Sequence, residues 1–186
     1  MWAGKGESMY RGKNRTACTS QKQIAEAMLE LLDDCSFQSI SVSSICRRAD
    51  ISRQTFYSLF ESKENVILYE LSESCSFQPD AGCGSTLTLQ QLAHNYSSYL
   101  TEHKVFLTKL VNNGIIHYMY DQQYRSLIEC DCFMADSSRE DRFFTADFLA
   151  SGMTSIARSY ILSGADEDEA YLENMICSLF SGKMIR

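Results

Sequence analysis

The chain has 186 residues, of which 45% are apolar and 22% charged, with one proline and nine glycines. This composition excludes a disordered, collagen-like or low-complexity chain, and the scarcity of helix breakers predicts an all-α fold. No run approaches the roughly 18 consecutive apolar residues of a membrane span, and the first residues lack an apolar secretory segment, so no membrane association is expected.

Charge is distributed unevenly along the chain. Residues 1–69 contain nine Lys or Arg and eight Asp or Glu, whereas residues 70–186 contain eight and sixteen, for a net charge of −7. This acidity argues against a protein that coats nucleic acid indiscriminately. It leaves room for a small basic surface near the amino terminus.

The first segment, residues 1–18, has no apolar period and is predicted to be a flexible basic arm, with Met9 as an alternative start. Its cations are Lys5, Arg11, Lys13 and Arg15. Arg11, Lys13 and Arg15 are expected to add non-specific affinity for DNA or to reach a minor groove.

A helical pattern begins at Thr19 or Ser20, either of which can cap the helix, and should end near Asp34. The residues of its buried face are Ile24, Ala27, Met28, Leu31 and Leu32. Phe37 and Ile40 follow in a short linker and are expected to close the core beneath this helix.

The next segment predicts two short helices joined by a tight turn. Ser41 can cap the first, and Ser52 can cap the second, which runs from Arg53 to Phe60. Asp50 opens the turn, and aspartate tolerates the left-handed conformation. The buried positions of the first helix are Val42, Ile45, Cys46 and Ala49. This arrangement is typical of a helix-turn-helix.

The second short helix has two unlike faces. At 100° per residue, one sector of about 140° holds polar side chains and the opposite side holds apolar ones. The polar set is Arg53, Gln54, Tyr57 and Ser58, and the apolar set is Phe56, Leu59 and Phe60, with Thr55 at the edge. The polar groups can reach base edges and phosphates in a major groove.

A further helix follows, capped by Ser62 and reaching about Cys75. Lys63 in its first turn opposes the helix dipole, which a nearby phosphate would explain. Residues 76–86 contain Pro79 and two close glycines and are predicted to be a linker. It separates a domain at 19–75 from a domain at 87–186.

The sequence of the second domain predicts five helices, and Gly164 is expected to end the fourth. The predicted ranges are 88–102, 104–112, 115–135 and 140–162. A last helix is predicted to start with an acidic first turn at 166–169 and to continue through 171–180.

From Ile45 through Lys63 the sequence resembles the DNA-binding domain of the TetR family of bacterial transcriptional regulators. The matching residues are Ser41, Val42, Ile45, Ala49, Ile51, Ser52, Thr55, Phe56, Tyr57, Phe60, Lys63 and Glu64. Cys46 and Asp50 stand where the family usually has alanine and glycine, and both fit sterically. The resemblance covers about residues 20–70.

The resemblance implies an amino-terminal three-helix helix-turn-helix domain and a larger helical dimerisation and ligand domain. It also implies a cytoplasmic homodimer that binds a pseudo-palindromic DNA operator and acts as a ligand-responsive repressor. Residues 148–164 look like the penultimate helix of such proteins. Dimerisation is therefore expected through the last two long helices, about residues 140–182, and the small-molecule effector is unknown.

The expected DNA contacts are Ser41, Ser43, Ser52, Arg53, Gln54, Thr55, Tyr57 and Lys63. The resemblance implies that Tyr57 and Lys63 bind phosphates. Arg53, Gln54 and Thr55 would contact bases or adjacent phosphates, whereas serines at helix starts can also be plain caps. Arg47 and Arg48 are read as ordinary solvated charges.

The candidate effector contacts are His94, Tyr99, His103, His117, Tyr120 and Tyr124. These polar aromatic side chains can equally be core residues, because aromatics at helical spacing usually are. No enzyme motif is present, the eight cysteines lack zinc-ligand spacing, and neither a cofactor nor a metal is expected.

Two other functions remain open from the residues alone. One is a helical protein-interaction module that keeps this fold with weak or lost DNA binding. The other is a thiol-based regulator in which Cys130 or Cys132 is oxidised in place of ligand binding.

Overall fold

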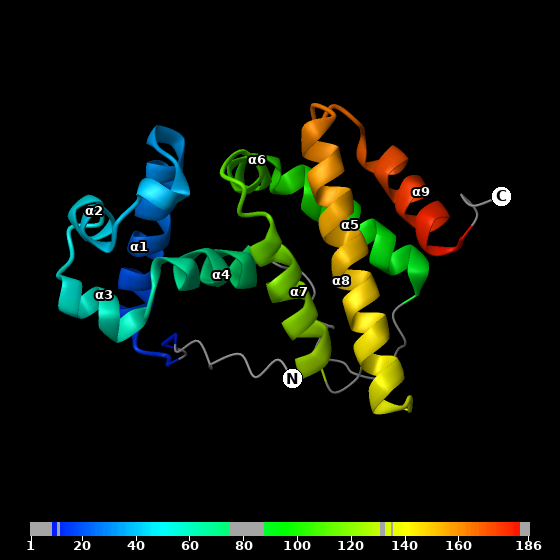
Figure 1. Ribbon diagram of the computed structural model, residues 1–186, viewed down its shortest axis with the longest axis horizontal. Coiled ribbons are helices and arrows are strands. Elements are labelled where there is room, and N and C mark those ends of the chain that lie inside the picture. The colour runs from blue at the N-terminus through cyan, green and yellow to red at the C-terminus, as the bar shows by residue number, and fades with distance from the viewer. Residues whose placement is uncertain (1–8, 11, 75–87, 131–132, 135, 183–186) are drawn as a thin grey trace. The chain divides into compact units, whose positions relative to one another are not determined.

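The computed structural model describes residues 9–10, 12–74, 88–130, 133–134 and 136–182, which fold into helices joined by turns (Figure 1). The chain divides into two compact units, Met1–Glu73 and Ser74–Arg186. The all-α prediction is confirmed for the described residues, where the one β-type pairing is an isolated bridge between Met9 and Phe60. The predicted linker at 76–86 lies outside these residues.

The first unit is built from four α-helices and a 3-10 turn. They are α1 (Arg15–Asp34), η1 (Phe37–Ser39), α2 (Val42–Arg48), α3 (Arg53–Leu59) and α4 (Lys63–Ser74). Helix α1 packs against both α2 and α3, and α2 packs against α3. Together α1, α2 and α3 form the predicted three-helix arrangement.

Helix α1 begins four residues before the predicted cap at Thr19. The Asn14 side chain accepts hydrogen bonds from the backbone amides of Thr16 and Ala17 at 3.0 and 3.4 Å, which starts the helix at Arg15. The prediction of a flexible arm through residue 18 is therefore wrong for residues 15–18. It failed because asparagine is a strong cap that the apolar pattern does not reveal.

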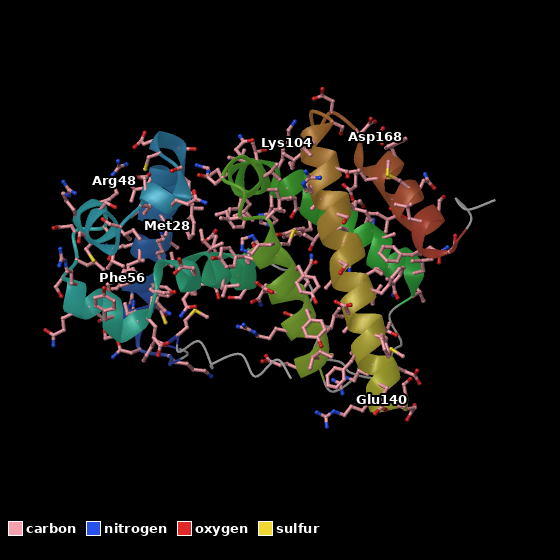
Figure 2. All side chains as sticks on the ribbon, viewed as in Figure 1. Met28, Arg48, Phe56, Lys104, Glu140 and Asp168 are labelled. Atoms are coloured by element: carbon pink, nitrogen blue, oxygen red, sulfur yellow. The ribbon has the colours of Figure 1, made fainter. Side chains whose placement is uncertain are left out.

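The core of the first unit takes side chains from each helix. Its fully buried residues include Ile24 and Met28 of α1, Ile45 of α2, Phe56 of α3 and Ile67 of α4. Met28 and Phe56 are marked in Figure 2. Phe37 and Ile40 are also buried, as predicted, so the linker between α1 and α2 closes the core.

The turn between α2 and α3 has the predicted geometry. Asp50 adopts a left-handed φ of 53°, and the amide of Ile51 donates to the carbonyl of Cys46 at 3.0 Å. Ser52 caps α3 by accepting from the amide of Thr55 at 3.0 Å. Ser41 caps α2 in a reciprocal pair with Ser44. The short turn thus holds α3 across α2.

The second unit contains five helices among the described residues. They are α5 (Leu89–Glu102), α6 (Lys104–Asn112), α7 (His117–Glu129), α8 (Arg139–Leu162) and α9 (Glu169–Phe180). Helix α5 lies along α9, and α7 lies along α8. The buried hydroxyl of Tyr96 in α5 donates to the carbonyl of Met153 in α8 at 2.6 Å, which joins the two pairs.

Helix α7 is shorter than the predicted range of 115–135. Ile115 lies in a turn after Gly114, whose φ is 69°, so the helix starts later. At the other end Arg142 of α8 donates from Nη2 to the carbonyls of Ile128 and Cys130 at 2.7 and 2.6 Å. A guanidinium from another helix therefore ends α7. Ala135 lies outside the described residues.

Candidate nucleic-acid interface

The two faces of α3 match the helical-wheel assignment. Phe56 and Leu59 are buried against the core, whereas Arg53, Gln54 and Ser58 are exposed. Tyr57 is 56% exposed, a high value for a large aromatic side chain. Thr55 is half-buried at the edge. A packed apolar face thus supports an outward-facing polar one.

Hydrogen bonds fix part of this polar face before any partner binds. Arg53 donates from Nη2 to the Ser43 hydroxyl at 2.5 Å, which joins the start of α3 to the start of α2. The hydroxyls of Ser52 and Thr55 lie 2.9 Å apart. Four of the eight expected DNA contacts are therefore held in one polar cluster at the helix starts.

Gln54 and Tyr57 differ from their neighbours on α3. Within the described part of the chain, neither the Gln54 amide nor the Tyr57 hydroxyl forms a hydrogen bond. The Tyr57 ring stands edge-on to Phe56, with centroids 5.5 Å apart. The core thus orients the ring, and its hydroxyl is left available to a partner.

Lys63, expected to bind a phosphate, forms hydrogen bonds inside the first unit. Its ammonium donates to the carbonyls of Phe37, Gln38 and Ile40 at 2.7, 3.3 and 2.8 Å. It also lies 4.5 Å from the centre of the Phe37 ring. Three carbonyl acceptors use the three donors of an ammonium group, so this structure gives Lys63 an internal role as the anchor of η1.

Arg48 is also engaged inside the first unit. It donates to Glu30 and Asp34 of α1 at 3.0 and 2.9 Å. The two carboxylates raise the pKa of its guanidinium, so the charge is committed to the α1–α2 contact. The sequence reading treated Arg48 as merely solvated. Arg47, in contrast, is exposed.

Ser41 acts chiefly as the cap of α2. Its hydroxyl accepts from the Ser44 amide at 3.1 Å, which is the alternative that the sequence left open. Ser43 holds Arg53 instead. Ser43 is therefore part of the polar cluster at the helix starts, whereas the hydrogen bonds of Ser41 stay within the start of α2.

The six effector candidates are not brought into one site. On α5, His94 is exposed beside Glu173 at 3.2 Å, and the buried Tyr99 stacks with Tyr96 at 6.0 Å between ring centres. His103 packs its ring on Tyr99 at 4.7 Å.

The other three candidates lie on α7. Tyr120 donates to Asp147 of α8 at 2.6 Å, and its ring stacks with Tyr124. This hydrogen bond, with burial, raises the pKa of Tyr120 to about 12. His117 is exposed beside Tyr118. Of these three residues, Tyr120 therefore joins α7 to α8.

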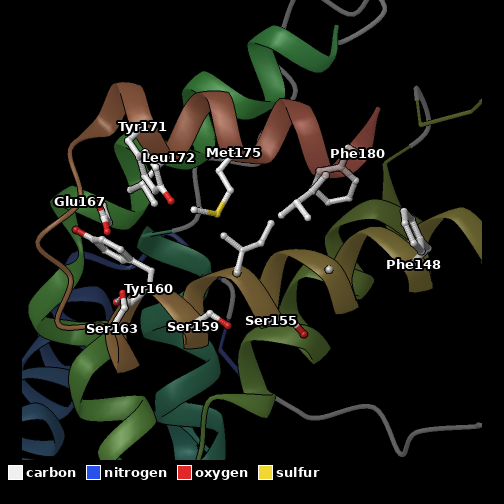
Figure 3. Close-up of a pocket in the computed structure, with 13 residues that line it drawn as sticks. Phe148, Ser155, Ser159, Tyr160, Ser163, Glu167, Tyr171, Leu172, Met175 and Phe180 are labelled. Atoms are coloured by element: carbon white, nitrogen blue, oxygen red, sulfur yellow. Dashed lines mark hydrogen bonds between the residues drawn. The ribbon is translucent and has the colours of Figure 1, made fainter. Parts of the chain in front are cut away.

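A hollow of about 520 Å³ lies between α8 and α9 in the second unit, and none of the six candidates lines it. Its lining is mostly apolar and includes Phe148, Ile156, Leu172, Met175 and Leu179. Figure 3 shows Met175 of α9 directed toward α8. Phe148 is 64% and Leu179 is 42% exposed. Two long helices thus share an uncovered apolar face.

Gln123 is a buried polar residue that sequence reasoning missed. It is 3% exposed, and its amide oxygen accepts from the Thr154 hydroxyl at 3.2 Å. Its Nε2 has no partner among the described residues. A glutamine in a helical pattern gives no signal of burial, so only the packing of α7 on α8 reveals it.

The two candidate redox thiols lie only partly within the described residues. Cys130 is half-buried, and Cys132 lies outside them. Burial raises the pKa of the Cys46 thiol, which lowers its reactivity. The described residues contain no group of three His, Cys, Asp or Glu side chains that could hold a metal, and none of their helices is long and apolar enough to cross a membrane.

Similar proteins carry the same architecture. The chain is 25% identical over 165 residues to the HTH-type dhaKLM operon transcriptional activator DhaS of Lactococcus lactis subsp. lactis (strain IL1403). The match covers 82% of this chain and 84% of that protein. No protein-family model matches the chain.

Solved structures extend the likeness over nearly the whole chain. Lin0861 from Listeria innocua matches with a TM-score of 0.78 at 16% identity, covering 96% of this chain and 97% of that one. A TetR-like transcriptional regulator from Rhodococcus sp. RHA1 matches with a TM-score of 0.51 at 15% identity, covering 90% and 97%. The chain has the TetR-like regulator fold. In this fold the polar face of α3 belongs to the helix-turn-helix, and α8 and α9 are the last two long helices.

Proposed function

We propose that this TetR-like chain is a cytoplasmic transcription regulator that binds a pseudo-palindromic DNA operator as a homodimer. The polar face of α3 carries the proposal, because an exposed guanidinium, amide and phenol project from a helix whose other face is packed. A helix-turn-helix places such a helix in the major groove. The helix-turn-helix regulator names of the similar proteins support the same function.

Each exposed group has a partner in duplex DNA. The Gln54 amide can donate to and accept from an adenine edge, and the Arg53 guanidinium suits guanine or a phosphate. The Tyr57 hydroxyl, at the end of a ring oriented by Phe56, suits a phosphate oxygen. Lys63 is left out of this contact set, since its ammonium already serves three carbonyls.

Two features support a homodimer: the short length of α3, which we call the reading helix, and the uncovered apolar face of the second unit. Helix α3 has seven residues, so one copy reads only part of a groove, and two copies are needed for a specific site. The apolar face shared by α8 and α9 is the surface we assign to the second copy. Exposed apolar patches of this kind mark protein contacts.

The resemblance to the TetR family implies a repressor, whereas the DhaS relative is named an activator. Transcription from a bound promoter in vitro, with and without the protein, measures the direction. A small-molecule effector held by the second unit is part of the proposal. A compound that raises the melting temperature and also changes DNA affinity would identify it.

The test of DNA reading is fluorescence anisotropy on a genomic fragment recovered by selection of bound DNA, with a mixed-sequence duplex as competitor. We expect Gln54→Ala to reduce the ratio of specific to non-specific affinity by about 10-fold or more. Tyr57→Phe should weaken binding to both duplexes. The control is Gln23→Ala, which removes an exposed amide from α1.

Recovery of no fragment, or equal behaviour of Gln54→Ala and Gln23→Ala, would contradict the proposal. The protein-interaction module would then be the better description.

The dimer is tested separately by light scattering. We expect Phe148→Glu to yield a monomer that no longer binds the fragment at two chains per site. The control is Val105→Glu on α6, since Val105 is 72% exposed but lies outside the hollow. A Phe148→Glu protein that stays dimeric would remove this face from the proposal.

A further inference from the structure

The described part of the amino-terminal segment is docked onto the reading helix. Met9 forms an antiparallel bridge with Phe60, and the amide of Tyr10 donates to the carbonyl of Leu59 at 3.0 Å. We call these two residues the Met9–Tyr10 strap. The last carbonyls of a helix lack partners within the helix, so the strap supplies one at the end of α3.

A buried side chain of α1 also holds the strap. Gln21 of α1 is 3% exposed, and its Nε2 donates to the carbonyl of Tyr10 at 2.9 Å. A buried amide needs a partner. The strap thus satisfies a polar group inside the three-helix core and is part of that core.

The chain then turns back over the Tyr10 ring. The Tyr10 hydroxyl accepts from the amide of Asn14 at 3.3 Å, and Asn14 caps α1. A Cβ on Gly12 would lie 2.2 Å from that hydroxyl, so glycine allows the close turn. Tyr10, Gly12 and the start of α1 at Asn14 therefore lie close together beside α3.

Two cations project from this turn. Lys13 and Arg15 are exposed, and neither forms an ion pair with a described residue. Lys13 is three residues from Tyr10, a chain distance of at most about 10 Å. The major groove that would receive α3 is about 12 Å wide and is bordered by phosphates. A lysine held that close to the end of α3 can reach the bordering backbone.

We propose that the Met9–Tyr10 strap holds Lys13 and Arg15 as an extension of the reading surface that binds DNA phosphates beside the groove occupied by α3. This inference rests on the proposed function. Because phosphate contacts are independent of sequence, the extension would strengthen binding to the operator and to unrelated duplex alike. Because Gln21 already anchors the strap, less conformational entropy is lost when Lys13 and Arg15 bind phosphates.

The experiment measures the dependence of affinity on salt, using a mixed-sequence duplex and the selected fragment. Each phosphate contact contributes about 0.9 to the slope of log K against log salt, or about 3.5-fold in affinity between 50 and 200 mM. We expect Lys13→Gln to lower the slope by about 0.9 per bound chain on both duplexes. Arg15→Gln should do the same. The control is Lys22→Gln, which removes an exposed cation two turns further along α1.

A second variant tests the strap itself. Gln21→Met keeps a side chain of similar length but loses the hydrogen bond to Tyr10. We expect it to lower the salt slope as much as the Lys13→Gln, Arg15→Gln double variant. If Gln21→Met does not fold, the two surface variants still decide the matter.

The outcomes separate this inference from the proposed function. Wild-type protein that binds neither duplex contradicts the proposed function. Wild-type binding with Lys13→Gln and Arg15→Gln slopes equal to that of Lys22→Gln overturns the inference alone. A loss confined to the selected fragment would also overturn it, because that result indicates base reading.

Discussion

The α2–α3 region of the first unit and the α7–α8 region of the second unit use polar side chains differently. In the first unit the polar groups that shape the α2–α3 region lie close together in the sequence, as in the Ser41–Ser44 and Ser52–Thr55 pairs. In the second unit they join distant helices, as in Tyr120 with Asp147. A short motif can specify the first kind of site. The second kind depends on how long helices pack.

Truncation of a core side chain in one unit should have the largest effect, because it destabilises that unit and leaves the other folded. We expect Phe56→Ala to destabilise the first unit by about 3–5 kcal/mol, because a fully buried ring is removed. Amide hydrogen exchange should accelerate in α2 and α3 while α8 stays protected. Gln54→Ala, an exposed change on the same helix, is the control. Equal loss of protection in α8 would show that the two units unfold together.

Lys63→Met tests whether this lysine of the first unit stabilises the fold or binds DNA. The change removes the donors to three carbonyls while keeping the side-chain length. We expect a loss of about 1.5–3 kcal/mol in urea unfolding, as for a hydrogen-bonded charge. The salt slope of DNA binding should not change. A lower slope with unchanged stability would instead return Lys63 to the DNA contacts.

One residue with a left-handed backbone conformation in each unit allows the same substitution to be compared between the units. Asp50 has a φ of 53° and Ala165 a φ of 55°. We expect Asp50→Gly to raise the free energy of unfolding by about 0.5–1 kcal/mol, because glycine adopts this conformation without strain. Ala165→Gly should gain less, since it also loses a buried methyl group. Thermal unfolding measures both, and a loss at Asp50 would contradict the strain argument.

The smallest expected effect is a pH dependence confined to the second unit. The hydrogen bond to Asp147, with burial, raises the pKa of Tyr120 from 10.0 to about 12. The folded state then holds this proton more tightly than the unfolded state. Its contribution to stability is therefore complete below pH 10.0 and lost as pH rises toward about 12.

Absorbance titration of the tyrosinate form checks this prediction. Tyr120→Phe should remove one phenol that titrates near pH 12, and it should flatten the loss of stability above pH 10.0. Tyr57→Phe, on the exposed face of α3 in the first unit, is the control. An unchanged late titration in Tyr120→Phe would contradict the assignment.

Much of the first unit could be predicted from the sequence because its signals are local. Caps at Ser41 and Ser52, the turn at Asp50 and the two faces of α3 each depend on residues a few positions apart. The position of Lys63 in the first turn of α4 was predicted correctly, but the partners of its side chain could not be predicted. Its acceptors are carbonyls more than 20 residues away, and backbone groups carry no sequence signal.

The second unit was predictable in its helices but not in its sites. Thr88 capping α5 and Gly164 after α8 are local signals. Burial of Gln123 and the hollow between α8 and α9 arise only from the packing of whole helices. The polar aromatic residues were candidate ligand contacts because of their chemistry. In the structure, Tyr120 joins α7 to α8.

The guanidinium of Arg142 has a practical consequence for protein engineering. By holding the last carbonyls of α7 from α8, it fixes the end of one helix independently of the segment that leads to the next. Ser138 fixes the start of α8 by accepting from the Asp141 amide. With both anchor points secured outside the connection, the exposed Asp136–Ser137 position is suited to receive an inserted reporter peptide at small cost in stability.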